Sequence, residues 1–109
     1  MPYDEGLAHR IREVIKYLPG STERKMFGRI GFLINGNMAC GVINTDLIIR
    51  VGPDNYEDAL TEDHTREFDM TGRPMTGWMV VSAKGYAEDE DLRKWLSKGV
   101  EYAQSLPGK

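Results

Sequence analysis

The chain has 109 residues, which is a usual length for one domain and too short for two hydrophobic cores. Its 40% hydrophobic and 28% charged residues exclude a disordered or low-complexity polypeptide. The formal net charge of −3 argues against direct nucleic-acid binding, which depends on clustered Lys and Arg. We therefore expect a single domain over residues 1–109.

No stretch of the sequence predicts a membrane span or an export signal. The longest apolar runs, 30–34 and 38–43, are far shorter than the roughly 20 residues that cross a bilayer. The N-terminus carries Asp4 and Glu5 rather than a basic stretch followed by an apolar one. Cys40 is the only cysteine, so an intrachain disulfide is excluded and a reducing compartment is indicated. We expect a cytoplasmic protein.

The first predicted elements are a helix and an edge strand. Asp4 is a suitable N-cap, Pro19-Gly20 a stop signal, and the residues between them repeat apolar side chains at helical spacing, which predicts a helix over residues 4–18. Those apolar residues are Leu7, Ile11, Val14, Ile15 and Leu18. Residues 23–27 are expected to form a short edge strand that ends at Gly28.

Asn35-Gly36 predicts a type I′ hairpin between strands 29–34 and 37–43, because this dipeptide tolerates two positive φ angles. If Ile34 faces Asn37, both faces of the hairpin are apolar. One face then carries Leu33, Met38, Cys40 and Val42, and the other carries Ile30, Phe32, Ile34, Ala39 and Ile43.

A turn at Thr45-Asp46 leads into a strand over residues 47–51. A two-residue loop places Ile48 on the face of Phe32, and a slip of one residue in register exchanges the two faces. On the unslipped register, the face of Cys40 and Val42 also receives Leu47, Ile49 and Val51.

The second half of the chain predicts a short helix over 55–60 entered from Asp54, a strand at 66–70, a turn at 71–74 and a strand at 78–82. A final helix begins at the acidic run 88–91, which suits the positive end of its dipole, and ends before Pro107. Its inward stripe contains Leu92, Trp95, Leu96, Gly99, Val100 and Ala103. This order of elements predicts an α+β fold, an antiparallel sheet with helices mostly on one face.

Several runs of sequence, in this order and spacing over roughly residues 3–107, resemble the N-terminal domain of the TfoX/Sxy competence regulators. The runs are Lys25-Met26-Phe27-Gly28, Gly31 to Met38, Arg50-Val51-Gly52-Pro53, Thr71 to Met75, and Gly77-Trp78. The resemblance implies a two-layer fold akin to the type III secretion chaperones.

The resemblance also implies a role as a non-enzymatic regulatory domain that binds a protein partner such as a transcription regulator, with no cofactor and no established catalytic residues. Full-length competence regulators of this type act as transcriptional co-activators and carry a second, helical domain that residues 1–109 do not include. Relatives often have a second glycine after Met-Phe-Gly, where this chain has Arg29.

Other residues that could carry chemistry have simpler structural explanations. Cys40 could be a nucleophile, but a cysteine among apolar strand residues usually behaves as a small hydrophobe. His9 and His64 are expected in solvent near carboxylates, and their spacing predicts no metal site. A modest basic patch is expected to be a solvated face; its residues are Arg10, Arg12, Lys16, Arg24, Lys25 and Arg29.

The residues expected to contact a partner are Arg29, Phe32, Ile34, Arg73 and Met75. Arg73 lies in a proline-stiffened turn, where it could anchor a carboxylate or merely cap the sheet edge. The alternative function is a small-molecule-binding domain or an enzyme that uses Cys40 or Arg73.

Two apolar sheet faces predict self-association, because one helix layer covers only one of them. The exposed set is Ile30, Phe32, Ile34, Ile43 and Ile48, or the opposite set if the register slips. We expect a two-fold homodimer through that face. The alternative is a three-layer monomer in which the first helix covers one face and the last helix covers the other.

Overall fold

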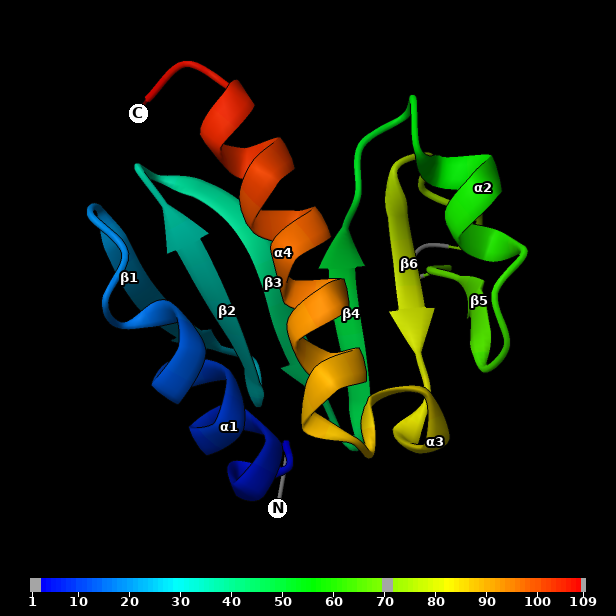
Figure 1. The fold of residues 1–109 in the computed structure, drawn as a ribbon, viewed down its shortest axis with the longest axis horizontal. Helices are drawn as coiled ribbons and strands as arrows, with labels where there is room; N and C mark the ends of the chain where they lie inside the picture. The colour runs from blue at the N-terminus through cyan, green and yellow to red at the C-terminus, as the bar shows by residue number, and fades with distance from the viewer. Residues whose placement is uncertain (1–2, 70–71, 109) are drawn as a thin grey trace.

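A computed structural model describes residues 3–69 and 72–108 of the chain (Figure 1). Its six strands form one antiparallel sheet in the order β1-β2-β3-β4-β6-β5, and helices complete an α+β fold, as predicted. The elements are α1 (Glu5–Ile15), β1 (Ser21–Met26), β2 (Arg29–Ile34), β3 (Asn37–Ile43), β4 (Asp46–Arg50), α2 (Tyr56–Leu60), β5 (Thr65–Glu67), β6 (Trp78–Val81), α3 (Ala83–Tyr86) and α4 (Asp89–Ser105).

Helix α1 begins where its cap was predicted. The Asp4 carboxylate accepts a hydrogen bond from the Leu7 N–H at 3.1 Å, which satisfies one of the free donors of the first turn. The helix ends at Ile15, three residues earlier than predicted. The Asp4 N–H donates to the Asn44 carbonyl at 2.7 Å, so the start of α1 is fixed against the turn between β3 and β4.

The hairpin at Asn35-Gly36 is confirmed. The two residues have φ angles of 52° and 82°, and strands β2 and β3 have the predicted bounds. The next turn lies one residue earlier than predicted, because Asp46 already pairs with Ile43 as the first residue of β4. The earlier turn shifts the pairing of β4 by two residues, which keeps Leu47 and Ile49 on the predicted face with Val42 and Cys40.

A β-bulge changes the predicted faces of the central hairpin. Phe32 lies opposite Cys40, but the next residue, Leu33, lies opposite Met38, so Ala39 is the extra residue of β3. The bulge turns Cys40 onto the same face as Phe32. The predicted grouping of Cys40 with Leu33 and Met38 is therefore wrong, as is the placement of Ile48 beside Phe32.

Both long helices cover the same face of the sheet, α1 over the β1–β2 end and α4 diagonally across the middle (Figure 1). The two-layer arrangement is confirmed, and the three-layer alternative is wrong. The predicted stripe of α4 packs against the sheet, with Leu92, Trp95, Leu96, Gly99 and Ala103 buried.

Two residues expected to meet a partner lie in this core instead. Phe32 and Ile34 are each 1% exposed and pack beneath the helices, because the bulge at Ala39 and the placement of α1 put their face inside. Ile30, which was also expected to face water, is equally buried. A Phe32→Asp substitution would therefore bury a charge in the core and unfold the domain.

The second half of the chain follows the predicted order with shorter elements. Strand β5 ends at Glu67 rather than at residue 70, and α3 was not predicted. Residues 70 and 71 lie outside the described part of the chain, so the end of the predicted strand and the start of the predicted turn at 71–74 do too. No helix of the described residues is long and apolar enough to cross a membrane.

Candidate functional site

The side of the sheet opposite α1 and α4 is hollowed by a groove of about 640 Å³, and we call this side the open face. Its floor comes from β2, β3 and β4, whose residues alternate between the core and this face. The apolar side chains of the floor are Leu33, Met38, Ile43 and Ile48. One apolar face of the sheet thus lies away from α1 and α4, as predicted, but of the residues predicted on it only Ile43 and Ile48 are there.

Two glycines on the floor of the groove increase its depth. Gly31 and Gly41 lie opposite each other on β2 and β3. A Cβ on Gly31 would lie 2.4 Å from the Met38 Cε, and one on Gly41 would lie 2.8 Å from the Ile30 carbonyl oxygen. Because neither residue has a side chain, the Met38 methyl group settles over both and the centre of the open face stays hollow.

One wall of the groove comes from the segment between β5 and β6. The rings of Phe68 and Trp78 lie 6.3 Å apart at a tilt of 39°. The Met75 N–H donates to the Phe68 carbonyl at 3.0 Å, which holds the segment closed on itself. The groove is lined here by Phe68, Met75 and Trp78, so aromatic rings and a flexible methionine side chain form this wall rather than polar groups.

Three arginines, Arg24, Arg29 and Arg50, line the groove, and no Asp or Glu is among the described residues that line it. The Arg50 guanidinium lies 5.1 Å from the centre of the Trp78 ring and 5.3 Å from that of Tyr102. The groove therefore joins an apolar floor to a positively charged margin.

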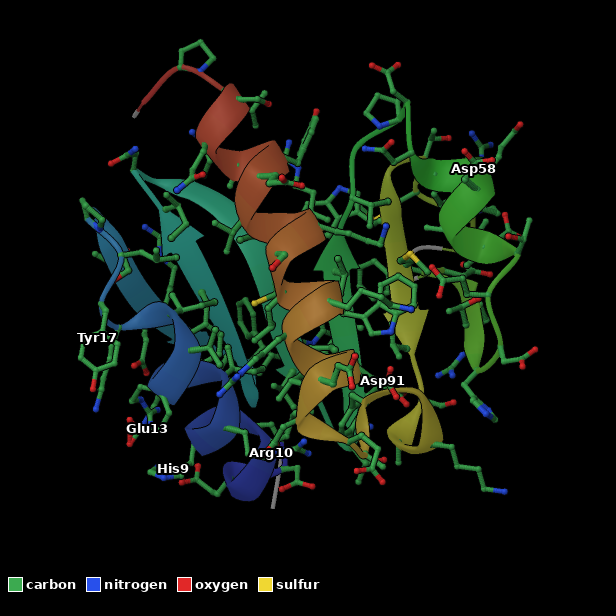
Figure 2. The ribbon with its side chains drawn as sticks, in the orientation of Figure 1. His9, Arg10, Glu13, Tyr17, Asp58 and Asp91 are labelled. Carbon is green, nitrogen blue, oxygen red and sulfur yellow. The ribbon has the colours of Figure 1, made fainter. Side chains whose placement is uncertain are left out.

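On the helix-covered side of the sheet, basic residues form ion pairs with carboxylates. There Arg10 and Arg12 of α1, and Lys16 directly after the helix, each pair with a carboxylate; the pairs are Arg10–Asp89 at 3.0 Å, Arg12–Glu23 at 2.6 Å and Lys16–Glu13 at 2.5 Å. The hydrogen bond from Arg12 lowers the pKa of Glu23. Figure 2 shows Arg10 between α1 and α4. The predicted basic patch is thus divided: Arg10, Arg12 and Lys16 pair with carboxylates, Arg24 and Arg29 line the groove, and Lys25 lies on the other side of β1, opposite the core residue Ile30.

A family model described as the TfoX N-terminal domain matches residues 13–103, which include all six strands and most of the core. The chain belongs to the TfoX N-terminal domain family. A search of curated proteins found no match. The predicted resemblance is confirmed.

In this TfoX N-terminal domain, the predicted contact residues do not form one site. Arg29 and Met75 line the groove, Phe32 and Ile34 lie in the core, and Arg73 is exposed outside the groove lining. Sequence reasoning missed the rest of the groove, above all Phe27, Arg24 and Trp78. The available signal for Phe27 was its place before Gly28 in a turn, which favours exposure.

The histidines and acidic residues of the TfoX N-terminal domain form no metal cluster among the described residues. His9 lies on the outer side of α1, with its Nε2 3.8 Å from the Glu13 Oε1 (Figure 2). His64 lies at a turn with φ 66°.

Cys40 is 1% exposed and packs within the core, where burial raises the pKa of its thiol. A thiol that is both inaccessible and protonated is a poor nucleophile. We expect Cys40 to react with an alkylating reagent about a hundredfold more slowly in the native protein than in denaturant, because buried cysteines are inert. Mass spectrometry of timed reactions measures this ratio, and equal rates would contradict the burial.

The same burial predicts a loss of stability at alkaline pH. The folded chain holds the thiol proton more tightly than the unfolded chain, in which the thiol titrates near pH 8.5, so this contribution is present below that pH and lost above it. Between about pH 8 and about pH 10, wild type should lose about 2 kcal/mol more unfolding free energy than Cys40→Ala. Urea titrations of both proteins at the two pH values test this. Tyr56 and Tyr86 are present in both proteins, so their own titration cancels from the comparison.

Proposed function

We propose that this TfoX N-terminal domain is a regulatory, protein-binding domain and that its open face is the binding surface. The observation that carries the proposal is a sheet face that no helix of the described residues covers and that is hollowed into an apolar groove of about 640 Å³. Apolar patches of this kind on soluble proteins usually mark interfaces. Membership of the TfoX N-terminal domain family supports transcription regulation as the setting.

Site-specific photo-crosslinking in the native cell tests the proposal. A photoreactive amino acid at Ile43, half-buried on the open face, should capture a defined protein, whereas the same amino acid at Ser97, exposed on α4, should not. Capture of the same proteins from both positions, or of none from Ile43, would contradict the proposal.

The regulatory role has its own test. Transcript profiles of a deletion strain should be reproduced by an Ile43→Asp strain, because a carboxylate on the floor disrupts an apolar contact without entering the core. A deletion strain whose profile equals that of wild type would contradict a regulatory role.

The second candidate function is small-molecule binding, because the groove volume falls within the range of ligand pockets. An arginine-lined apolar groove suits an organic acid. Native mass spectrometry of the purified protein separates the two candidates, since a co-purifying small molecule that Ile43→Asp releases would favour this one.

A further inference from the structure

Phe27 makes no evident contribution to the fold. It is 91% exposed at the turn between β1 and β2 and lines the groove. Its φ of 53° lies in the left-handed region, which is unfavourable for residues with a bulky side chain and readily adopted by Asn and Gly. An exposed aromatic residue on a strained turn beside a groove is typical of a binding anchor.

The margin of the groove near Phe27 carries arginines. Arg24, on the same hairpin, is exposed and makes no ion pair within the described part of the chain, and it lies opposite Gly31 on the open face. Arg29 and Arg50 also line the groove. Asp46 points to the same face but lies outside the groove lining and already pairs with Arg66 at 2.8 Å. In a chain of net charge −3, this face is a positive region.

We infer that the open face binds an acidic segment of a partner protein, in which Phe or Leu side chains alternate with Asp or Glu. The apolar side chains fill the groove next to Phe27, and the carboxylates pair with Arg24 and Arg50 at its margin. This inference rests on the proposed function and adds the chemical class of the partner.

Two other occupants fit these observations less well. A second copy packed face to face would bring two sets of arginines together with no carboxylate in either groove lining as described. A nucleic acid would meet Phe27 and Trp78 as stacking surfaces, but the floor of the groove is aliphatic and offers no donors to phosphates along a strand. The homodimer stays a prediction, and both occupants are outcomes of the test below.

The experiment uses four labelled probes and fluorescence anisotropy. The first is a short synthetic peptide in which Phe and Leu alternate with Asp and Glu. The second replaces its acids with Lys, the third replaces its apolar residues with Ser, and the fourth is a short oligo-dT strand. Only the first should bind at micromolar concentration, and binding should weaken as salt is added. It should also change the emission of Trp78, which lines the groove, whereas Trp95 is buried.

Two matched pairs of variants locate the site. Phe27→Asn creates a second Asn-Gly turn like Asn35-Gly36, so it should keep or raise the melting temperature while weakening the first peptide about tenfold. Tyr17→Asn, at an aromatic residue that is 77% exposed beside α1 (Figure 2), should leave binding unchanged.

Arg24→Glu should also weaken the peptide about tenfold, because it reverses a charge at the groove margin. Arg93→Glu makes the same change of net charge on an exposed part of α4 and should leave binding unchanged.

Three results would overturn the inference. Tighter binding of oligo-dT than of the acidic peptide would assign the face to nucleic acid. A dimer in analytical ultracentrifugation that Ile43→Asp dissolves would assign it to a second copy. Failure of every peptide, with specific crosslinking from Ile43 retained, would leave the proposed function standing and reject an acidic partner.

Discussion

Replacing Trp95 by alanine should lower the free energy of unfolding by about 3–5 kcal/mol, a large share of the roughly 5–15 kcal/mol that stabilises a domain of this size. Trp95 is 2% exposed and lies in the middle of the α4 stripe that packs on the sheet. The substitution removes the largest fully buried side chain and leaves a cavity between helix and sheet. Urea titration followed by circular dichroism measures the change.

The control for this prediction is a second aromatic residue outside the core. Tyr17→Ala should change the stability by no more than about 0.5 kcal/mol, because the side chain is 77% exposed. If Trp95→Ala lowered the free energy of unfolding as little as Tyr17→Ala, Trp95 would not be buried between α4 and the sheet.

Local chemistry explains which elements the sequence predicts accurately. The strands on either side of Asn35-Gly36 have the predicted bounds because the turn fixes both strand ends and their register. Asp4 caps α1 as predicted because capping depends on a few neighbouring residues. Helix α3 escaped prediction because its four residues are too few to show a period.

The candidate site was harder to predict because it depends on tertiary packing. Whether Phe32 or Leu33 faces the groove is decided by the bulge at Ala39 and by which face α1 and α4 cover. A local pattern shows neither of these, so of the residues predicted to contact a partner Arg29 and Met75 line the groove, whereas Phe32 and Ile34 lie in the core. The exposure of Phe27 likewise follows from its position at a hairpin tip rather than from its residue type.

The bulge also explains a glycine inside α4. An ideal Cβ on Gly99 would lie 2.3 Å from the Ala39 carbonyl oxygen and 3.2 Å from its carbonyl carbon, far inside any normal contact. The obstacle is backbone, so it cannot rotate away as a flexible side chain could. Gly99, on the inward stripe as predicted, thus lets α4 approach the extra residue of β3.

Gly99→Ala therefore sets two effects of opposite sign against each other. Alanine favours a helix over glycine by about 1 kcal/mol, whereas forcing α4 away from the bulge should cost about 1–3 kcal/mol and also loosen the packing of Trp95 one turn earlier. We expect the steric cost to be larger and the variant to melt at a lower temperature than wild type. Ser97→Ala, exposed on the same helix, serves as the control and should be neutral or slightly stabilising. A Gly99→Ala variant more stable than wild type would show that α4 does not rest on the bulge.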